Sequence, residues 1–268
     1  MALHESNADA SPNTTQRPQL LVQISDCHLF DDRATVKRGV NTYDSLRDVV
    51  AQINASETRP DVLLTTGDIS HDEGATSYQH FADLVLHTAE IVRVLPGNHD
   101  TAAFSEALAP WNVAVTDIGA HWRLVALDTT VPGALHGHLN GRQFALLDDA
   151  VASAGDRNIV VAMHHNPVMD QNDAPDPIML DNARILLQHL TAWRQVRVLL
   201  WGHTHRAYDC RVDNMRLLSA PSTGFQFRLE NGAIQTDDAP AGYRWLKLYD
   251  DGSIATGVKR LAPKKKGI

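Results

Sequence analysis

Short runs of apolar residues recur along the chain. They are separated by stretches in which apolar residues recur only every three or four positions. Each run has the length of a strand and is almost continuously apolar, as expected for a parallel strand buried on both faces. The runs predict strands at residues 20–25, 62–66, 91–95, 159–163 and 196–201. The sequence therefore predicts a sheet that is covered on both sides.

The stretches between these runs repeat apolar residues every three or four positions, which is typical of amphipathic helices. Four such faces consist of Tyr43, Leu46, Val50 and Ile53; Tyr78, Phe81, Ala82 and Val85; Phe144, Leu147 and Val151; and Ala183, Leu186, Leu187 and Leu190. Strands that alternate with helices indicate parallel βαβ units and an α/β fold.

Two segments depart from this alternation. Residues 113–117 and 122–128 flank Gly119 and predict a hairpin, and several short strands with turns follow from Arg211 onward. The sheet is therefore expected to be mixed, with antiparallel additions.

A length of 268 residues allows one large α/β domain or two small ones. Because the sequence has neither an internal repeat nor an interior low-complexity linker, we expect a single domain over residues 19–262. The polar residues 1–18 predict a disordered tail, and residues 263–268, with Lys264, Lys265 and Lys266, predict a short basic tail. No secretory signal peptide is expected, and no apolar run approaches the roughly 20 residues of a membrane helix.

The composition is that of a globular protein, with 43% hydrophobic and 21% charged residues. A formal net charge of −8 argues against non-specific nucleic-acid binding through an overall positive field. The two cysteines, Cys27 and Cys210, are too few for a disulfide framework. We therefore expect a cytoplasmic protein.

Residues suited to metal binding follow each of the five predicted strands. They are Asp26, His28, Asp68, Asn98, His164, His203 and His205. In an open parallel sheet, ligands bind beyond the carboxyl ends of the strands, so these side chains should converge at one edge. Buried acids repel each other and neutral imidazoles need a partner, and divalent cations satisfy both requirements.

Seven protein ligands exceed the four of one tetrahedral zinc ion, whereas two ions that share one carboxylate would use them all. Side chains at positions i and i+2 of an extended strand point the same way. Asp26 with His28, and His203 with His205, could each serve one site in this manner, with Cys27 directed away into packing. The neighbouring glycines would let the chain turn sharply after each strand.

The blocks D-x-H, G-D, G-N-H-D, H and G-H-x-H occur here in this order, and in them the sequence resembles the calcineurin-like metallophosphoesterases. Further segments look like the bacterial class III 3′,5′-cyclic AMP phosphodiesterases. They are Leu29-Phe30, residues 39–42, residues 77–81, His136-Gly137, residues 221–223 and residues 242–244. The resemblance extends from about residue 19 to about residue 261.

This resemblance implies a four-layer α/β/β/α sandwich of two mixed sheets flanked by helices. It assigns one metal ion to Asp26, His28 and His205, and a second to Asn98, His164 and His203, with Asp68 bridging. His99 would be the catalytic histidine. Substrate would lie against His28, Asp68, Asn98, His99, His205 and His136. His165 is the alternative to its neighbour His164, which fits better because it comes directly after the strand.

The implied reaction is hydrolysis of 3′,5′-cyclic AMP to 5′-AMP by attack of a metal-bound hydroxide, with two divalent ions as cofactors. A ligand set without thiolate suits Fe, Mn, Zn or Co, and we expect iron or manganese in at least one position. The expected partner is a small-molecule cyclic nucleotide, with neither a membrane nor a nucleic acid as partner. A homodimer is compatible with the resemblance.

Two alternatives stay open. The same metal residues would serve hydrolysis of other diesters, such as 2′,3′-cyclic nucleotides, glycerophosphodiesters, phospholipid head groups or nucleic-acid ends. A metal-binding scaffold without catalysis is disfavoured, because neither a ligand nor His99 is lost. The chain contains no P-loop or nucleophile-elbow sequence, which argues against a covalent intermediate. His138 stands where relatives carry Glu, so the substrate is less defined than the metal site.

Other polar residues have less specific placements. Surface or packing roles are predicted for His71, His80, His87, His121 and His189. Asp72 and Asp100 could accept hydrogen bonds from ligand imidazoles, and Asp100 could instead lie at a helix N-terminus. For Tyr243 and Arg244, packing and surface roles are favoured over nucleotide binding.

Overall fold

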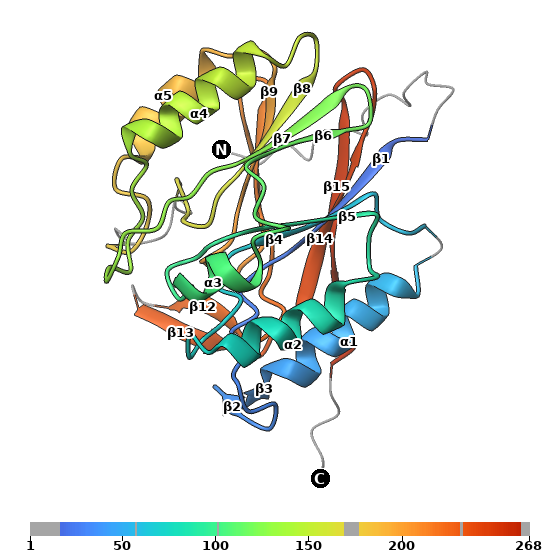
Figure 1. Cartoon of the computed structure of the whole chain (residues 1–268), viewed down its shortest axis with the longest axis vertical. Coiled ribbons are helices and arrows are strands. Elements are labelled where there is room, and N and C mark those ends of the chain that lie inside the picture. Colours follow the sequence, from blue (N-terminus) through green and yellow to red (C-terminus); the bar gives the residue numbers. More distant parts are fainter. Residues whose placement is uncertain (1–16, 57, 101, 169–176, 231–232, 264–268) are drawn as a thin grey trace.

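The computed structural model describes residues 17–263 apart from 57, 101, 169–176 and 231–232. Two β-sheets pack face to face, and helices cover their outer faces (Figure 1). This is the four-layer α/β/β/α arrangement of two mixed sheets that the resemblance implies, so the predicted fold class is confirmed.

The first sheet has the strand order β15-β14-β1-β4-β5. Its strands are β1 (Gln19–Ile24), β4 (Val62–Thr66), β5 (Ile91–Leu95), β14 (Gly242–Leu248) and β15 (Ile254–Arg260). The strands β1, β4 and β5 are parallel, whereas β14 and β15 extend the sheet in antiparallel fashion.

The second sheet has the order β10-β11-β9-β8-β7-β6. Its strands are β6 (Val115–Ile118), β7 (Trp122–Ala126), β8 (Asn158–Ala162), β9 (Val196–Trp201), β10 (Tyr208–Val212) and β11 (Met215–Ser219). The four inner strands are parallel and the two edge strands are antiparallel to their neighbours. The predicted hairpin across Gly119 is the pair β6 and β7.

Helices cover the outer face of each sheet (Figure 1). The first sheet carries α1 (Thr42–Asn54), α2 (Ala75–Val85) and the short α3 (Ala102–Ala107), and the second carries α4 (Gly141–Ala152) and α5 (Ala183–Thr191). The side chains of Asn41 and Asn140 accept hydrogen bonds from backbone N–H groups in the first turns of α1 and α4. These N–H groups have no partner within their own helix.

The space between the sheets is filled by alternate residues of the strands, because successive side chains of a strand point to opposite faces. Leu21 lies in this central layer with Leu124 and Leu200 of the second sheet, whereas Val22 packs with the helices over the first sheet. Gln23 faces the central layer and donates a hydrogen bond to the carbonyl of Trp201 at 2.9 Å. The two sheets are thus joined by apolar packing and by a buried polar contact.

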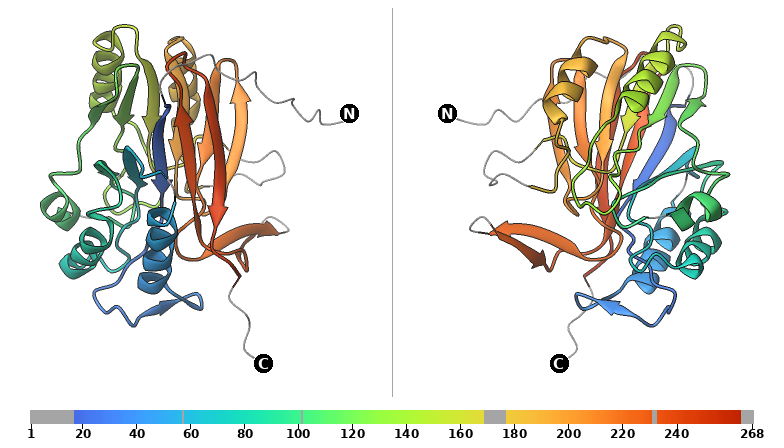
Figure 2. Two further views of the ribbon diagram at one scale, coloured as in Figure 1. Left: turned by 90° about the vertical axis from the view of Figure 1, so that its right-hand side faces the viewer. Right: turned by 60° about the vertical axis from the view of Figure 1, so that its left-hand side comes forward.

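Two small hairpins stand apart from the sheets. The hairpin β2 (Val36–Lys37) and β3 (Val40–Asn41) precedes α1, and the hairpin β12 (Gln226–Glu230) and β13 (Ala233–Asp237) precedes β14. The turned views show β12 and β13 projecting from the body of the molecule (Figure 2). The hydrophobic pattern did not predict β2, β3 or α3, because each is too short to show a period.

The five predicted core strands and the four predicted helices are present, with strand bounds shifted by at most one residue. One expectation is wrong: the five strands do not end at the edge of one open sheet, since β8 and β9 belong to the second sheet. The predicted tails fall mostly on residues outside the described ranges, and the single domain over residues 19–262 stays a prediction. No helix of the described residues is long and apolar enough to cross a membrane.

Candidate dinuclear metal centre

The candidate ligands lie in loops that leave the carboxyl ends of strands in both sheets. Backbone hydrogen bonds join two of these loops, from Asp26 N to the Gly67 carbonyl at 3.0 Å and from His28 N to the Asp68 carbonyl at 2.9 Å. The chain is not extended here, in contrast to the prediction. Left-handed backbone, with φ between 47° and 64°, is found at Asp26, His28, Asp68, His203 and His205.

Glycines beside the ligands make room for them. A Cβ on Gly97 would collide with the carboxylate of Asp68 and lie 2.8 Å from Cε1 of His164, and a Cβ on Gly202 would lie 3.0 Å from Asp26 Oδ2. Gly67 has a φ of 90°, which favours glycine and agrees with the predicted turn, whereas Gly97 and Gly202 are not in the left-handed region. Their role is close packing against ligand side chains, not the sharp turn that the sequence suggested.

The first cluster consists of Asp26, His28 and His205, all at most 3% exposed. Nε2 of His28 lies 3.1 Å from Nε2 of His205, and Nε2 of His205 lies 3.5 Å from Oδ1 of Asp26. Three ligand atoms therefore point at one small volume.

The second cluster consists of Asn98, His164 and His203. Nε2 of His164 lies 3.1 Å from Oδ1 of Asn98 and 3.2 Å from Nδ1 of His203. His203 also donates its backbone N–H to the Asp26 carboxylate at 3.0 Å, which ties the two clusters together.

Asp68 lies between the clusters. Its Oδ2 is 3.7 Å from Nε2 of His28, and its Oδ1 is 3.4 Å from Nε2 of His164. One carboxylate thus presents an oxygen to each cluster, which is the geometry that a bridging ligand needs.

The imidazoles have a defined orientation and charge. Nδ1 of His164 faces the Thr66 carbonyl and Nδ1 of His205 faces the Phe225 carbonyl, both at 2.7 Å, so Nε2 of each ring is directed toward the clusters. Burial lowers the pKa of His28 well below its usual value, lowers the pKa of His205, and lowers the pKa of His203 to about 3. These three rings are neutral at pH 7, as metal binding requires.

The buried carboxylates of the site lie against imidazoles that partly compensate their charge. Burial raises the pKa of Asp26, and the nearby imidazoles of His205 and His164 offset this rise only in part. Burial opposes the charged forms of both Asp68 and His164, but their mutual attraction raises the pKa of His164 to about 9 and lowers that of Asp68. A set of imidazole nitrogens and carboxylate and amide oxygens, buried around two adjacent volumes, fits two divalent cations.

His99 borders the first cluster. Its backbone N–H donates to Asp68 Oδ1 at 2.9 Å, and its ring centre lies 5.0 Å from that of His28. His99 is half-buried, in contrast to the buried candidate ligand His28.

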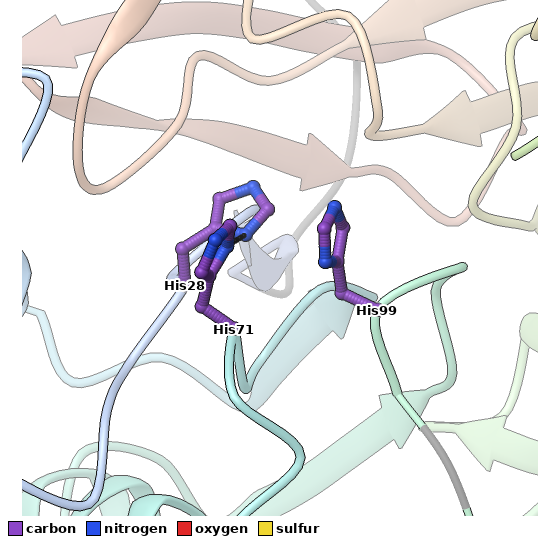
Figure 3. A group of neighbouring side chains, drawn as sticks. All are labelled: His28, His71 and His99. Carbon is purple, nitrogen blue, oxygen red and sulfur yellow. Dashed lines mark hydrogen bonds between the residues drawn. The ribbon is translucent and has the colours of Figure 1, made fainter.

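His71 belongs to this group, although a surface or packing role was predicted for it. Its ring stacks on that of His99 at 4.8 Å, and its Nδ1 lies 3.2 Å from Nδ1 of His28 (Figure 3). Burial, followed by the charges of His99 and Lys37, lowers the pKa of His71 to about 4. Its position only three residues after Asp68 was the signal that could have identified it.

His165 lies beside the second cluster, with its ring 4.9 Å from that of His203. Its Nδ1 bonds to the hydroxyl of Thr129 at 2.7 Å, whereas Nε2 of His164 faces Asn98 and Asp68. His164 is thus the ring that faces Asp68 and Asn98, and its choice over His165 as a ligand stays a prediction.

The loop that contains His136 reaches the second cluster through Gly137, where a Cβ would lie 2.5 Å from the ring of His165. The half-buried His136 stands next to this contact. His138 is exposed and pairs with Asp181 at 2.8 Å.

The two candidate supporting acids bind backbone and not ligand imidazoles. Asp100 accepts from the backbone N–H groups of Ile69, Ser70 and Gly97 at 2.9–3.2 Å, and burial, followed by the charge of Asp68, raises its pKa to about 7. Asp72 accepts from the N–H of Asp31 at 2.9 Å. Both acids hold the loops that carry ligands, which corrects the predicted role.

Three other residues pack as predicted. Cys27 is fully buried, and burial raises the pKa of its thiol. Tyr243 lies in the core under the helices, and Arg244 is buried and donates to the carbonyl oxygens of Ser219 and Tyr208 across the two sheets.

Sequence reasoning missed an aromatic wall beside the first cluster. Phe225 stacks on His28 at 5.2 Å, and Phe227 lies 4.4 Å from the ring of His205. The guanidinium of Arg38, in the turn between β2 and β3, lies 5.1 Å from the Phe227 ring centre and donates to Thr236 in β13. This wall depends on long-range contacts between the two hairpins, so no local sequence motif predicts it.

Comparisons with known proteins agree with this geometry. Residues 20–207 match the family of calcineurin-like phosphoesterases. The chain is 39% identical to the 3′,5′-cyclic adenosine monophosphate phosphodiesterase CpdA of Pseudomonas aeruginosa, over 92% of each protein, and 34% identical to that of Escherichia coli K12, over 90% of each. A dimetal phosphatase from Danio rerio shares the fold, with a TM-score of 0.65 and 17% identity over 91% of this chain and 97% of that one. The chain belongs to the calcineurin-like phosphoesterases, hydrolases that use divalent metal ions.

Proposed function

We propose that the protein is a dinuclear-metal phosphodiesterase that hydrolyses 3′,5′-cyclic AMP to 5′-AMP. The observation that carries this proposal is the position of Asp68, with one carboxylate oxygen toward each imidazole cluster. The relatives whose names state this substrate align over at least 90% of the chain, which supports the same reaction here.

In this proposal, Asp26, His28 and His205 hold one ion, Asn98, His164 and His203 hold the other, and Asp68 contacts both. When bound, the two ions supply an activated water and offset the negative charge on the phosphate. Nitrogen and oxygen donors without thiolate suit Fe, Mn, Zn or Co, and iron or manganese in at least one position stays a prediction.

His99 is the proposed catalytic side chain. Its backbone N–H bonds to Asp68, and the half-buried residue places its ring 5.0 Å from that of His28, so the imidazole can face a phosphate beside the first cluster. There it can donate a hydrogen bond to a phosphoryl oxygen or a proton to the departing 3′ oxygen, a role worth about 10²–10⁴-fold. His28, Asp68, Asn98, His205 and His136 are the other proposed substrate neighbours.

A cytoplasmic location is proposed with this function, because Cys27 and Cys210 are both free thiols. A homodimer and the lack of a nucleic-acid partner stay predictions. Size-exclusion chromatography with light scattering would measure the first.

The test is kcat/KM for 3′,5′-cyclic AMP beside 2′,3′-cyclic AMP and bis(p-nitrophenyl) phosphate, on protein depleted of metal and reloaded with Mn²⁺. The matched control is the His99→Ala variant, which keeps the proposed metal ligands. A clear preference for the 3′,5′ isomer is expected. Turnover of only the artificial diester would leave a phosphodiesterase but reject cyclic AMP as its substrate.

A further inference from the structure

The ring nitrogens that face away from the clusters show how the imidazoles are held. Histidines that bind metals usually donate their second N–H to an acceptor, which fixes the ring. For His164 the acceptor is the Thr66 carbonyl, and for His205 it is the Phe225 carbonyl.

His28 differs, because the atom facing its Nδ1 is another imidazole nitrogen. Its Nε2 faces the first cluster, 3.1 Å from His205 Nε2, while its Nδ1 lies 3.2 Å from Nδ1 of His71. If Nε2 of His28 keeps its lone pair for a metal, Nδ1 of His28 carries the proton. Nδ1 of His71 is then the acceptor of the hydrogen bond from Nδ1–H of His28.

The other contacts of His71 lead to the proposed catalytic residue. Its ring stacks on His99 at 4.8 Å with planes 23° apart, and it contacts the ring of Phe30 at 4.9 Å. Figure 3 shows the three histidines grouped around one space, with His28 and His71 overlapping in this view and His99 across from them. His71 therefore touches a candidate ligand through its edge and the catalytic candidate through its face.

We propose that His71 is a positioning residue with two separable actions. Its Nδ1 accepts the Nδ1–H of His28 and holds Nε2 of that ring toward the metal, and its ring face fixes the orientation of His99. This inference rests on the proposed function, since it takes His28 as a metal ligand.

Two substitutions separate the two actions. His71→Phe keeps a ring against His99 and removes the acceptor, whereas His71→Asn places an amide oxygen near the position of Nδ1 and removes the ring. The matched controls are His87→Phe and His87→Asn at an exposed histidine just after α2. Mn²⁺ affinity of the metal-depleted protein is measured by titration calorimetry, and kcat and KM are measured at saturating Mn²⁺ with bis(p-nitrophenyl) phosphate.

We expect His71→Phe to weaken Mn²⁺ binding at one of two sites by about 10- to 100-fold. We expect His71→Asn to keep wild-type Mn²⁺ affinity and to lower kcat by about 10-fold or more, with KM unchanged. Equal Mn²⁺ affinity in His71→Phe and wild type, or equal loss in both variants, would overturn the proposal. If the phenylalanine variant does not fold, His71→Leu tests the loss of the acceptor in its place.

The metal titration does not depend on the natural substrate. Wild-type protein that binds no Mn²⁺ would reject the proposed metal centre itself. Wild-type protein that binds two ions, together with a His71→Phe variant that does the same with equal affinity, would reject only the role of His71.

Discussion

The two clusters of the candidate metal centre differ in their ligands and in the residues around them. The first cluster has a carboxylate of its own, Asp26, and is walled by the rings of Phe225, Phe227, His71 and His99. The second has the amide of Asn98 in the place of a carboxylate and lies against the polar pair His165 and Thr129. Only Asp68 is common to both.

This difference predicts unequal ions. The first position combines the carboxylate of Asp26 with two imidazoles, so a cation there is attracted by more negative charge. The second position has only neutral ligands apart from Asp68. We expect the first ion to bind more tightly and the second to exchange more easily.

Removal of the shared ligand should have the largest effect. Asp68→Ala takes one ligand from each ion, and losses of at least about 10–100-fold per site multiply to 10²–10⁴-fold in activity. Metal analysis should find both positions depleted. Full occupancy by two ions in this variant would contradict a bridging role for Asp68.

His99→Ala should separate chemistry from metal binding. Because His99 contacts His28 but belongs to neither ligand set, kcat should fall by about 10²–10⁴-fold while metal content stays at the wild-type level. Steady-state kinetics and metal analysis of the same sample check this. A variant that loses its metal would instead place His99 among the ligands.

Asp26→Asn makes the first cluster resemble the second. The amide can still accept the His203 N–H, but the unshared charge is lost, so affinity for the tighter ion should fall by about 10–100-fold. Calorimetry should then show two sites of similar affinity. Asp156→Asn, at an exposed aspartate in the turn after α4, serves as control. Unchanged affinities in Asp26→Asn would show that the charge of Asp26 does not set the difference.

Gly97→Ala tests the packing under the shared ligand. The new methyl group meets the Asp68 carboxylate and the His164 ring, so we expect a loss of about 1–3 kcal/mol in the free energy of unfolding. At Gly141 a Cβ meets nothing within 4 Å, so Gly141→Ala is the matched control. Denaturant unfolding compares the two, and equal stability would show that the loops shift without cost.

Arg38→Ala should have the smallest effect, confined to the wall of the first cluster. An exposed cation over an aromatic ring contributes about 0.5–1 kcal/mol, which corresponds to about 2- to 5-fold in KM for the anionic substrate. We expect kcat to stay unchanged. A large fall in kcat would mean that the two hairpins position the ligands themselves.

The sequence predicted what depends on local pattern. Buried strands such as residues 62–66 are visible as apolar runs, and ligands such as Asp68 follow them directly. The assignment of the five strands to two sheets needed the family resemblance. A buried parallel strand has the same apolar sequence pattern in either sheet. The left-handed backbone at His203 and the place of His71 depend on contacts between loops, which have no local period.

The strand order of the first sheet has a consequence for synthesis of the protein on the ribosome. β1, which ends just before Asp26 and His28, pairs on one side with β4 and on the other with β14, and the register joins Val22 to Trp245. Until residues 242–248 have emerged, β1 is an open edge that can pair with other chains. The nascent chain therefore carries four of its seven candidate metal ligands, Asp26, His28, Asp68 and Asn98, on an incomplete sheet. A truncation before β14 should aggregate rather than accumulate as a smaller enzyme.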